Sequence, residues 1–157
     1  MEKNEPIFQM VKEKVETIAQ EIEASKLQSA ANTLISLSRA GNQYLNEKEP
    51  WKVIKTDKDR AAGIFNVCMQ IVKALAVASS PFIPSSADQL WQTLNLKGKA
   101  SETTWQEALT PLEAGHRINK PTPLFKKIDA DEKKLDEMLA QIRARILTTK
   151  KLTRNAG

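Results

Sequence analysis

The feature that most constrains this chain is the spacing of its apolar residues, which follows the period of an α-helix. In residues 7–22, apolar side chains recur every three or four positions, as they do on one face of a helix. The same spacing predicts further helices over roughly 26–46, over 58–79, from about 86, and over 129–146. We therefore predict an all-α fold, an antiparallel helix bundle of about five helices with an irregular segment near 97–128.

The length of 157 residues is most simply explained by a single domain over 1–157 with its own core. Residues 147–157 are expected to form a frayed tail of that domain.

Two pairs of residues have the spacing of a capping box, in which Ser caps the start of a helix and Gln reaches back to it. They are Ser25 with Gln28, and Ser86 with Gln89. We expect the first pair to open the second helix. The residues of this helix expected to face the core are Leu27, Ala30, Leu34, Leu37, Gly41 and Leu45.

The second helix is expected to end at Pro50, because proline cannot continue a helix. A short helical turn around Trp51 should follow. Thr56 or Asp57 then caps the long apolar helix over 58–79.

The net charge of +5 is unevenly distributed along the chain. Residues 116–157 hold eleven Lys and Arg against five Asp and Glu, so all the excess positive charge lies in the last quarter. A basic flank of this kind suits a polyanion such as nucleic acid. A solvated basic tail without a partner is the alternative.

Residue types that carry catalysis or hold metals are scarce. Cys68 is the only cysteine, so we expect no internal disulfide and no thiolate cluster, but a buried structural thiol. His116 is the only histidine and is expected to make a structural hydrogen bond. No glycine-rich phosphate loop is present. We therefore predict no catalytic residue and no metal site.

The most apolar stretch, residues 64–78, is interrupted by Asn66, Gln70 and Lys73, which argues against a membrane span. The first residues lack the apolar region of a signal peptide. Both features favour a cytoplasmic setting without a membrane partner.

The second helix carries an unusual polar face. Gln28, Asn32, Ser36 and Arg39 recur at helical spacing and form one stripe opposite the core face. Amides and a guanidinium can bind the edges of unpaired bases, and Arg can also bind phosphate. The alternative is an ordinary solvated face, since every surface helix needs one.

Trp105 lies in the polar segment "ASETTWQEA", with few apolar neighbours. An exposed indole there is a platform on which a base could stack. Alternatively, the ring folds back into a groove between helices.

Three motifs together resemble a known family: "GNQYLNEKEPW", then "PFIP", then a Trp followed at fixed spacing by "GHRI" and "PLFKKI". They are similar to the anticodon-binding domain of methionyl-tRNA synthetase, of the archaeal or eukaryotic class I type. The resemblance covers nearly the whole chain.

This resemblance implies that the chain reads the CAU anticodon of methionine tRNA. In the family, a Trp at the position of Trp105 stacks on anticodon bases, and polar residues on the helix that precedes the "NQY…PW" segment contact base edges. The positions that the resemblance assigns to anticodon binding are Trp105, Asn32, Gln28, Arg39 and Asn42. Contacts to the tRNA backbone are expected from the basic last quarter, at Lys126, Lys127, Lys133, Lys134, Arg143 and Arg145.

The "HIGH" and "KMSKS" signatures of the family's ATP-binding domain are absent, as are zinc-knuckle cysteines. We therefore expect a recognition fragment that activates no amino acid by itself and holds no cofactor. ATP would bind in the catalytic domain of the parent methionine–tRNA ligase. The expected partners are methionine tRNA and that catalytic domain in the same polypeptide, and no oligomer is implied.

Three alternatives remain open. The chain could be the bundle of another class I synthetase, a helical protein-interaction module that does not bind RNA, or an independent enzyme.

Overall fold

A computed structural model describes residues 6–113, 115–125 and 136–143. The chain divides into two units, Met1–Leu124 and Phe125–Gly157, and each is described by itself. The single domain over 1–157 stays a prediction. The helices of the first unit are α1 (Pro6–Glu23), α2 (Leu27–Lys48), α3 (Pro50–Val53), α4 (Lys58–Ser79), α5 (Pro84–Thr93) and α6 (Trp105–Leu109), with a 3-10 turn η1 at Ala100–Glu102.

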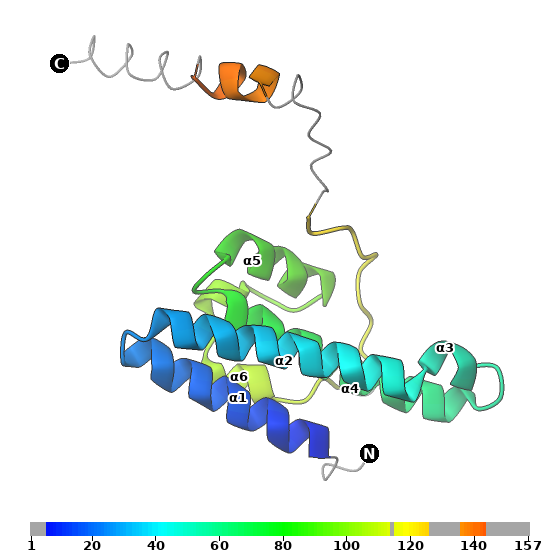
Figure 1. The fold of residues 1–157 in the computed structure, drawn as a ribbon. Coiled ribbons are helices and arrows are strands. Elements are labelled where there is room, and N and C mark those ends of the chain that lie inside the picture. Colours follow the sequence, from blue (N-terminus) through cyan, green and yellow to red (C-terminus); the bar gives the residue numbers. More distant parts are fainter. Residues whose placement is uncertain (1–5, 114, 126–135, 144–157) are drawn as a thin grey trace. The chain divides into compact units, whose positions relative to one another are not determined.

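The first unit is a helix bundle, which confirms the predicted all-α class (Figure 1). No strand occurs in the described ranges. The long helices α1 and α2 pack side by side, and both contact α4. The described part of the segment near 97–128, residues 97–113 and 115–125, is irregular as predicted, although it also contains the short helix α6.

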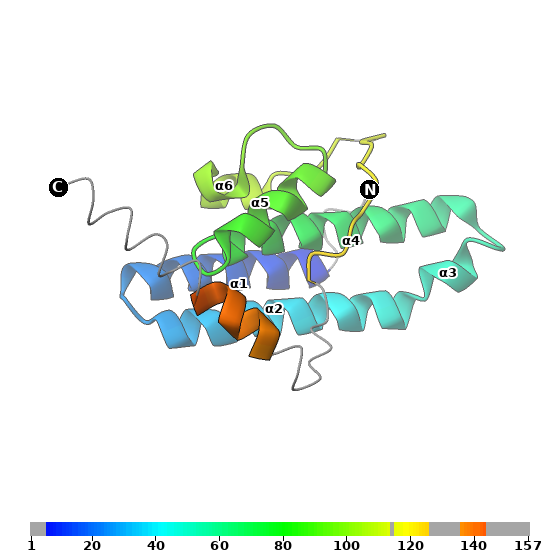
Figure 2. The same cartoon turned by 90° about the horizontal axis from the view of Figure 1, so that it is seen from above.

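The central helix is α4, against which α1, α2, α3, α5 and α6 all pack (Figure 2). By length and composition α4 is apolar enough to cross a membrane. In the bundle, however, half of its residues are buried by the other helices. The most deeply buried core side chains around it include Val15, Ile18, Leu37, Ile71, Ala74 and Trp91.

The capping box predicted at Ser25 and Gln28 is wrong. Ser25 has a φ of +59° and ends α1 instead of starting α2. Its N–H donates to Ile22 O, and the N–H of Lys26 donates to Glu21 O, which are the two hydrogen bonds of a Schellman motif. The turn between α1 and α2 is short, and the backbone groups of Ser25 and Lys26 close the end of α1 instead of capping the start of α2.

The capping box predicted at Ser86 and Gln89 is also wrong, because α5 begins earlier. Pro84 takes the first helical position, where its missing N–H costs no hydrogen bond. Ser86 and Gln89 therefore lie inside the helix.

The predicted cap of α4 and the predicted end of α2 are confirmed. Asp57 caps α4, and its side chain accepts a hydrogen bond from the Arg60 N–H at 2.9 Å. Helix α2 ends at Lys48, next to Pro50, and the short helix α3 contains Trp51.

Most of the predicted core face of α2 is buried or partly buried, but Leu27 is 58% exposed. Leu27 is the first residue of α2. The spacing of apolar residues identifies the inner face of a helix, but not how far neighbouring helices cover it.

Gly41 lets α2 and α4 approach closely. A Cβ at this position would lie 2.9 Å from Ile71 Cγ2, inside normal contact distance. The glycine of the "GNQYL" motif therefore has a packing role.

In the second unit, residues 136–143 are helical, and their side chains are exposed. They lie within the predicted helix over 129–146. The predicted helix start at Asp129 and the predicted tail over 147–157 lie outside the described residues.

Candidate nucleic-acid interface

The outer face of α2 presents four of the predicted anticodon-binding residues to solvent: Gln28, Asn32, Arg39 and Asn42 are all exposed. Within the part of the chain that the structure describes, none of these side chains hydrogen-bonds or forms an ion pair with another residue. Their donors and acceptors are therefore open to a ligand. We call these four residues the amide–arginine face.

The hydroxyl side chains of α2 are used differently. Ser36 accepts a hydrogen bond from Lys14 Nζ at 2.9 Å, and Thr33 donates to Glu21 Oε2 at 2.9 Å. Ser29 donates to the same carboxylate. These bonds join α2 to α1, so Ser36 belongs to the contact between the two helices and not to the open face.

Ile35 is a residue that sequence reasoning missed. Its side chain is 49% exposed, although it is large and apolar. It follows Asn32 by three positions and precedes Arg39 by four, so it lies in the middle of the amide–arginine face. An apolar residue breaking a polar stripe at helical spacing is the sequence signal that could have found it.

Trp105 occupies the first position of α6. Its side chain is partly buried and packs against the hydrophobic core. The structure thus combines the two interpretations of this residue: the ring is anchored in the bundle, while part of it remains accessible.

The structure does not bring α6 next to the amide–arginine face. Helix α6 packs against α1 and α4. In Figure 2, it lies on the far side of these two helices from α2. An RNA loop that contacts both Trp105 and α2 would therefore have to extend across the bundle.

The start of α6 is fixed locally by its cap. The Thr104 hydroxyl accepts a hydrogen bond from the Glu107 N–H at 3.3 Å. A threonine cap satisfies one of the free N–H groups at the start of a helix. The "TTW" sequence thereby sets the backbone that carries Trp105.

The "GHRIN" segment holds the chain against the end of α5. His116 Nε2 donates to Leu94 O at 2.5 Å, and Asn119 Nδ2 donates to Gln92 O at 2.7 Å. Asn95, with a φ of +57°, donates in return to Arg117 O at 3.1 Å. The structural interpretation of His116 is therefore confirmed.

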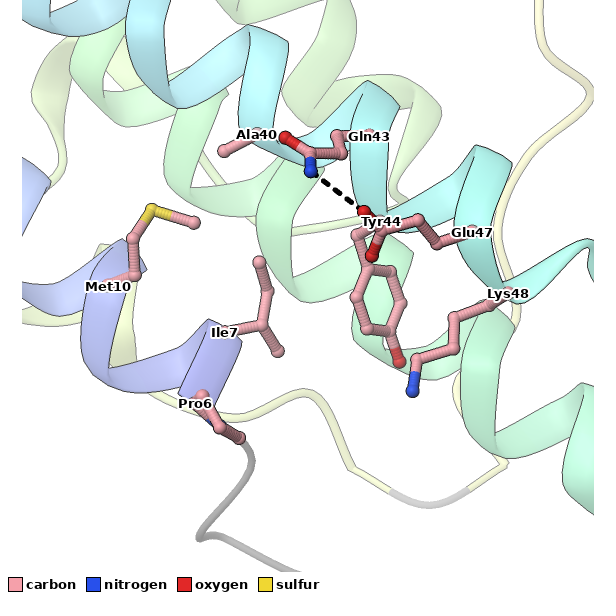
Figure 3. A pocket seen from close by; sticks show the side chains of 8 residues that line it. All are labelled: Pro6, Ile7, Met10, Ala40, Gln43, Tyr44, Glu47 and Lys48. Carbon is pink, nitrogen blue, oxygen red and sulfur yellow. Dashed lines mark hydrogen bonds between the residues drawn. The ribbon is translucent and has the colours of Figure 1, made fainter.

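A cavity of about 570 Å³ opens between the start of α1 and the end of α2 (Figure 3). Tyr44 of the "GNQYL" motif lines it and is 6% exposed, and Lys48 Nζ lies 5.5 Å from the centre of its ring. Gln43 donates to Glu47 across the cavity edge at 2.7 Å. Neither the residues of the amide–arginine face nor Trp105 line this cavity.

Of the residues predicted to contact the tRNA backbone, only Arg143 lies in the described ranges, where it is exposed on a helix. The others lie outside the described residues: Lys126, Lys127, Lys133, Lys134 and Arg145.

Titratable groups in the described ranges form no metal-binding cluster of three or more His, Cys, Asp or Glu. Burial raises the pKa of the Cys68 thiol, and a backbone hydrogen bond offsets part of this effect. A thiol with a raised pKa is a poor nucleophile at neutral pH.

The fold and this face together define a helical bundle with an open polar surface suited to unpaired bases. Comparison with known families shows which kind of helical bundle this is. The family model of the anticodon-binding domain of methionyl-tRNA ligase matches residues 1–144. The chain belongs to this family.

Individual relatives agree with the family assignment. Methionine–tRNA ligase of Methanopyrus kandleri is 34% identical over 83% of this chain and 20% of its own length. That of Pyrococcus furiosus is 38% identical over 74% of the chain and 16% of its own length. That of Bacteroides fragilis is 36% identical over 96% of the chain and 20% of its own length. The chain thus spans about a fifth of these relatives.

Proposed function

We propose that this chain recognises the CAU anticodon of methionine tRNA as one domain of a methionine–tRNA ligase. The observation that carries the proposal is the amide–arginine face of α2, whose hydrogen-bonding groups are open in a chain of this family. Proteins usually read RNA sequence by binding splayed-out bases of single-stranded loops. An anticodon loop presents such bases.

Each side chain of the face suits one part of this task. The amides of Gln28, Asn32 and Asn42 offer both donors and acceptors to base edges. Arg39 can bind a base edge or a phosphate with several N–H groups at once. Ile35 offers an apolar surface between them on which a base or ribose can rest.

Trp105 provides a second contact region, in which the accessible part of the indole stacks on a base. Such stacking contributes about 1–3 kcal/mol per base. Because the ring is anchored in the core, little side-chain freedom is lost when RNA binds.

The remaining parts of the proposal concern the parent enzyme. The catalytic domain would lie in the same polypeptide, bind ATP and attach methionine to the tRNA, in the cytoplasm. The chain itself would hold no cofactor. The basic last quarter would attract the anticodon stem without regard to its sequence, so its contribution weakens as salt is added.

The test is a nuclear magnetic resonance titration of the chain with an RNA hairpin that carries the CAU anticodon loop. We expect the side-chain amide signals of Gln28, Asn32 and Asn42 and the Trp105 indole signal to move. The signals of Gln9 and Gln20 on α1 serve as the matched amide controls and should stay in place. Changes that spare all four expected signals would contradict the proposal.

A further inference from the structure

Lys73 is a buried cation in the middle of α4. Its side chain is only 2% exposed, although α4 is otherwise the most apolar helix of the bundle. Burying an ammonium group is costly unless each of its N–H groups finds a partner. A lysine buried at such a position needs specific partners for its ammonium group.

All three partners of the ammonium group come from outside α4. Lys73 Nζ lies 2.5 Å from Glu107 Oε1 and 2.9 Å from Thr110 O. It also lies 5.8 Å from the centre of the Trp91 ring, over the ring face. Two of the three N–H groups of the ammonium thus have oxygen acceptors, and the Trp91 ring adds a cation–π contact.

Two of these partners belong to α6 and to the residue that caps its end. Glu107 is in its first turn, and Thr110 is the residue that follows its last turn. A cation at the end of a helix binds carbonyl oxygens that the helix leaves free. Lys73 therefore contacts the middle of α6 and the residue that follows its end from a single point in the core.

Helix α6 needs such an anchor because it has only five residues. A helix of this length is not stable without tertiary contacts. Trp105 is its first residue, two positions before Glu107. The orientation of the indole thus depends on how α6 is fixed.

We propose that Lys73 is a positioning residue for anticodon recognition, which fixes α6 and thereby sets the orientation of the Trp105 ring. This inference rests on the proposed function, in which Trp105 stacks on a base. Lys73 itself would touch no RNA, because it is buried.

The first variant to test is Lys73→Met, which keeps much of the side-chain volume and removes the charge. The bundle should still fold, since the Glu107 side chain is 43% exposed and can return to water. The matched control is Lys99→Met. Lys99 also pairs with a glutamate, Glu102 at 2.8 Å, but its side chain is 55% exposed.

The orientation of the Trp105 ring is followed by fluorine nuclear magnetic resonance on the full chain labelled with 5-fluorotryptophan. The chain gives three tryptophan signals, and the one missing in Trp105→Phe is assigned to Trp105. We expect the Trp105 signal of Lys73→Met to move or broaden, while the Trp51 signal stays in place. Lys99→Met should leave the Trp105 signal unchanged. An unchanged Trp105 signal in folded Lys73→Met would overturn the proposal.

A second pair of variants decides the matter if Lys73→Met does not fold. Glu107→Ala removes the carboxylate from a half-exposed position, and it should move the Trp105 signal in the same direction. Glu107→Gln keeps an acceptor oxygen and should largely restore it. Equal signals in wild type and Glu107→Ala would overturn the proposal.

The functional arm measures the ratio of affinities for methionine tRNA with CAU and with a changed anticodon. Lys73→Met or Glu107→Ala should lower this ratio about 10-fold, equivalent to about 1.4 kcal/mol, and leave binding of the changed tRNA unaltered. A moved Trp105 signal with an unchanged ratio would overturn the role in recognition. A wild type without any preference would instead refute the proposed function, while the fluorine result would still decide whether Lys73 orients Trp105.

Discussion

At the scale of single residues, the polar side chains of α2 fall into two sets: those that bond to α1 and those that remain open to solvent. The hydroxyls of Thr33 and Ser36 bind partners on α1, whereas Asn32 and Arg39 point to solvent. Hydrogen-bonding groups that serve the fold are thus separated from groups that remain open. The open groups are the ones able to distinguish one base from another.

Arg39→Ala removes the only cation from the amide–arginine face. We expect affinity for methionine tRNA with CAU to fall about 10-fold, because a charged hydrogen bond contributes about 1.5–3 kcal/mol. Binding of a tRNA with a changed anticodon should change much less. The control is Arg60→Ala, an equal loss of charge at an exposed position of α4. Equal losses for both tRNAs in Arg39→Ala would show that Arg39 contributes only general attraction.

Cys68 gives a prediction on pH. The pKa of its thiol in the folded chain is raised above that of an ordinary cysteine, chiefly by burial. The folded chain therefore keeps this proton to higher pH than the unfolded chain. Its contribution to stability is full below the unfolded pKa and is lost as pH rises through the folded pKa.

The measurement is the rate at which iodoacetamide alkylates Cys68, from neutral to alkaline pH. We expect the midpoint of the rise in rate to lie at a higher pH for the native chain than for the chain unfolded in urea. Cys68→Ser should show a smaller loss of stability between pH 8 and about pH 10. A native alkylation midpoint equal to the unfolded one would contradict this account.

At the scale of secondary-structure elements, two glycines allow a matched comparison. In Gly41→Ala, the new methyl group meets Ile71 Cγ2 at 2.9 Å, and overpacking of a core costs about 1–3 kcal/mol. The helix gains about 1 kcal/mol from alanine, so we expect a net loss of stability.

Gly63→Ala is the control, because no atom apart from its chain neighbours and the adjacent backbone of its own helix lies within 4 Å of the new methyl group. This variant should be stabilised by up to about 1 kcal/mol. Urea denaturation of both variants measures the difference. A Gly41→Ala chain as stable as Gly63→Ala would show that α2 and α4 separate at little cost.

Helix caps allow a second comparison. Asp57→Ala removes the side chain that caps α4 and should lower the free energy of unfolding by about 1 kcal/mol. Ser86→Ala, inside α5, should stay within about 0.5 kcal/mol of wild type. Thermal unfolding followed by circular dichroism provides the measurement. A larger loss in Ser86→Ala than in Asp57→Ala would contradict the observed helix starts.

These elements also show what the sequence could predict. Apolar spacing located α4 within its observed bounds, because a long helix with one buried face leaves a strong periodic signal. The capping boxes failed because the same spacing of Ser and Gln also occurs at the end of one helix and inside another. Cap geometry depends on backbone angles that spacing does not encode.

For the candidate site, the sequence predicted which residues of α2 share a face, but not how Trp105 is held. The positions of Gln28, Asn32 and Arg39 on one exposed face follow from helical spacing alone. The packing of Trp105 against the core was not predictable, because α6 is fixed by residues far away in the sequence: Lys73 contacts Glu107, 34 positions later. Long-range contacts of this kind leave no periodic pattern.

At the scale of the whole molecule, the bundle combines a rigid core with two separate contact regions. The amide–arginine face lies on α2, and Trp105 lies on α6 beyond α1 and α4. A ligand that uses both must be extended and flexible, as a single-stranded loop is. This arrangement favours the anticodon loop over a compact protein partner.

The most direct test of the central claim is equilibrium binding of the chain to methionine tRNA with CAU and to the same tRNA with a changed anticodon. Both titrations are repeated at low and moderate salt, with Trp105→Ala beside the wild type. We predict that salt weakens binding of both tRNAs, because phosphate contacts release counterions. The preference of the wild type for CAU should persist at moderate salt and should be lost in Trp105→Ala. Equal affinity for the two tRNAs, falling together as salt is added, would contradict anticodon recognition.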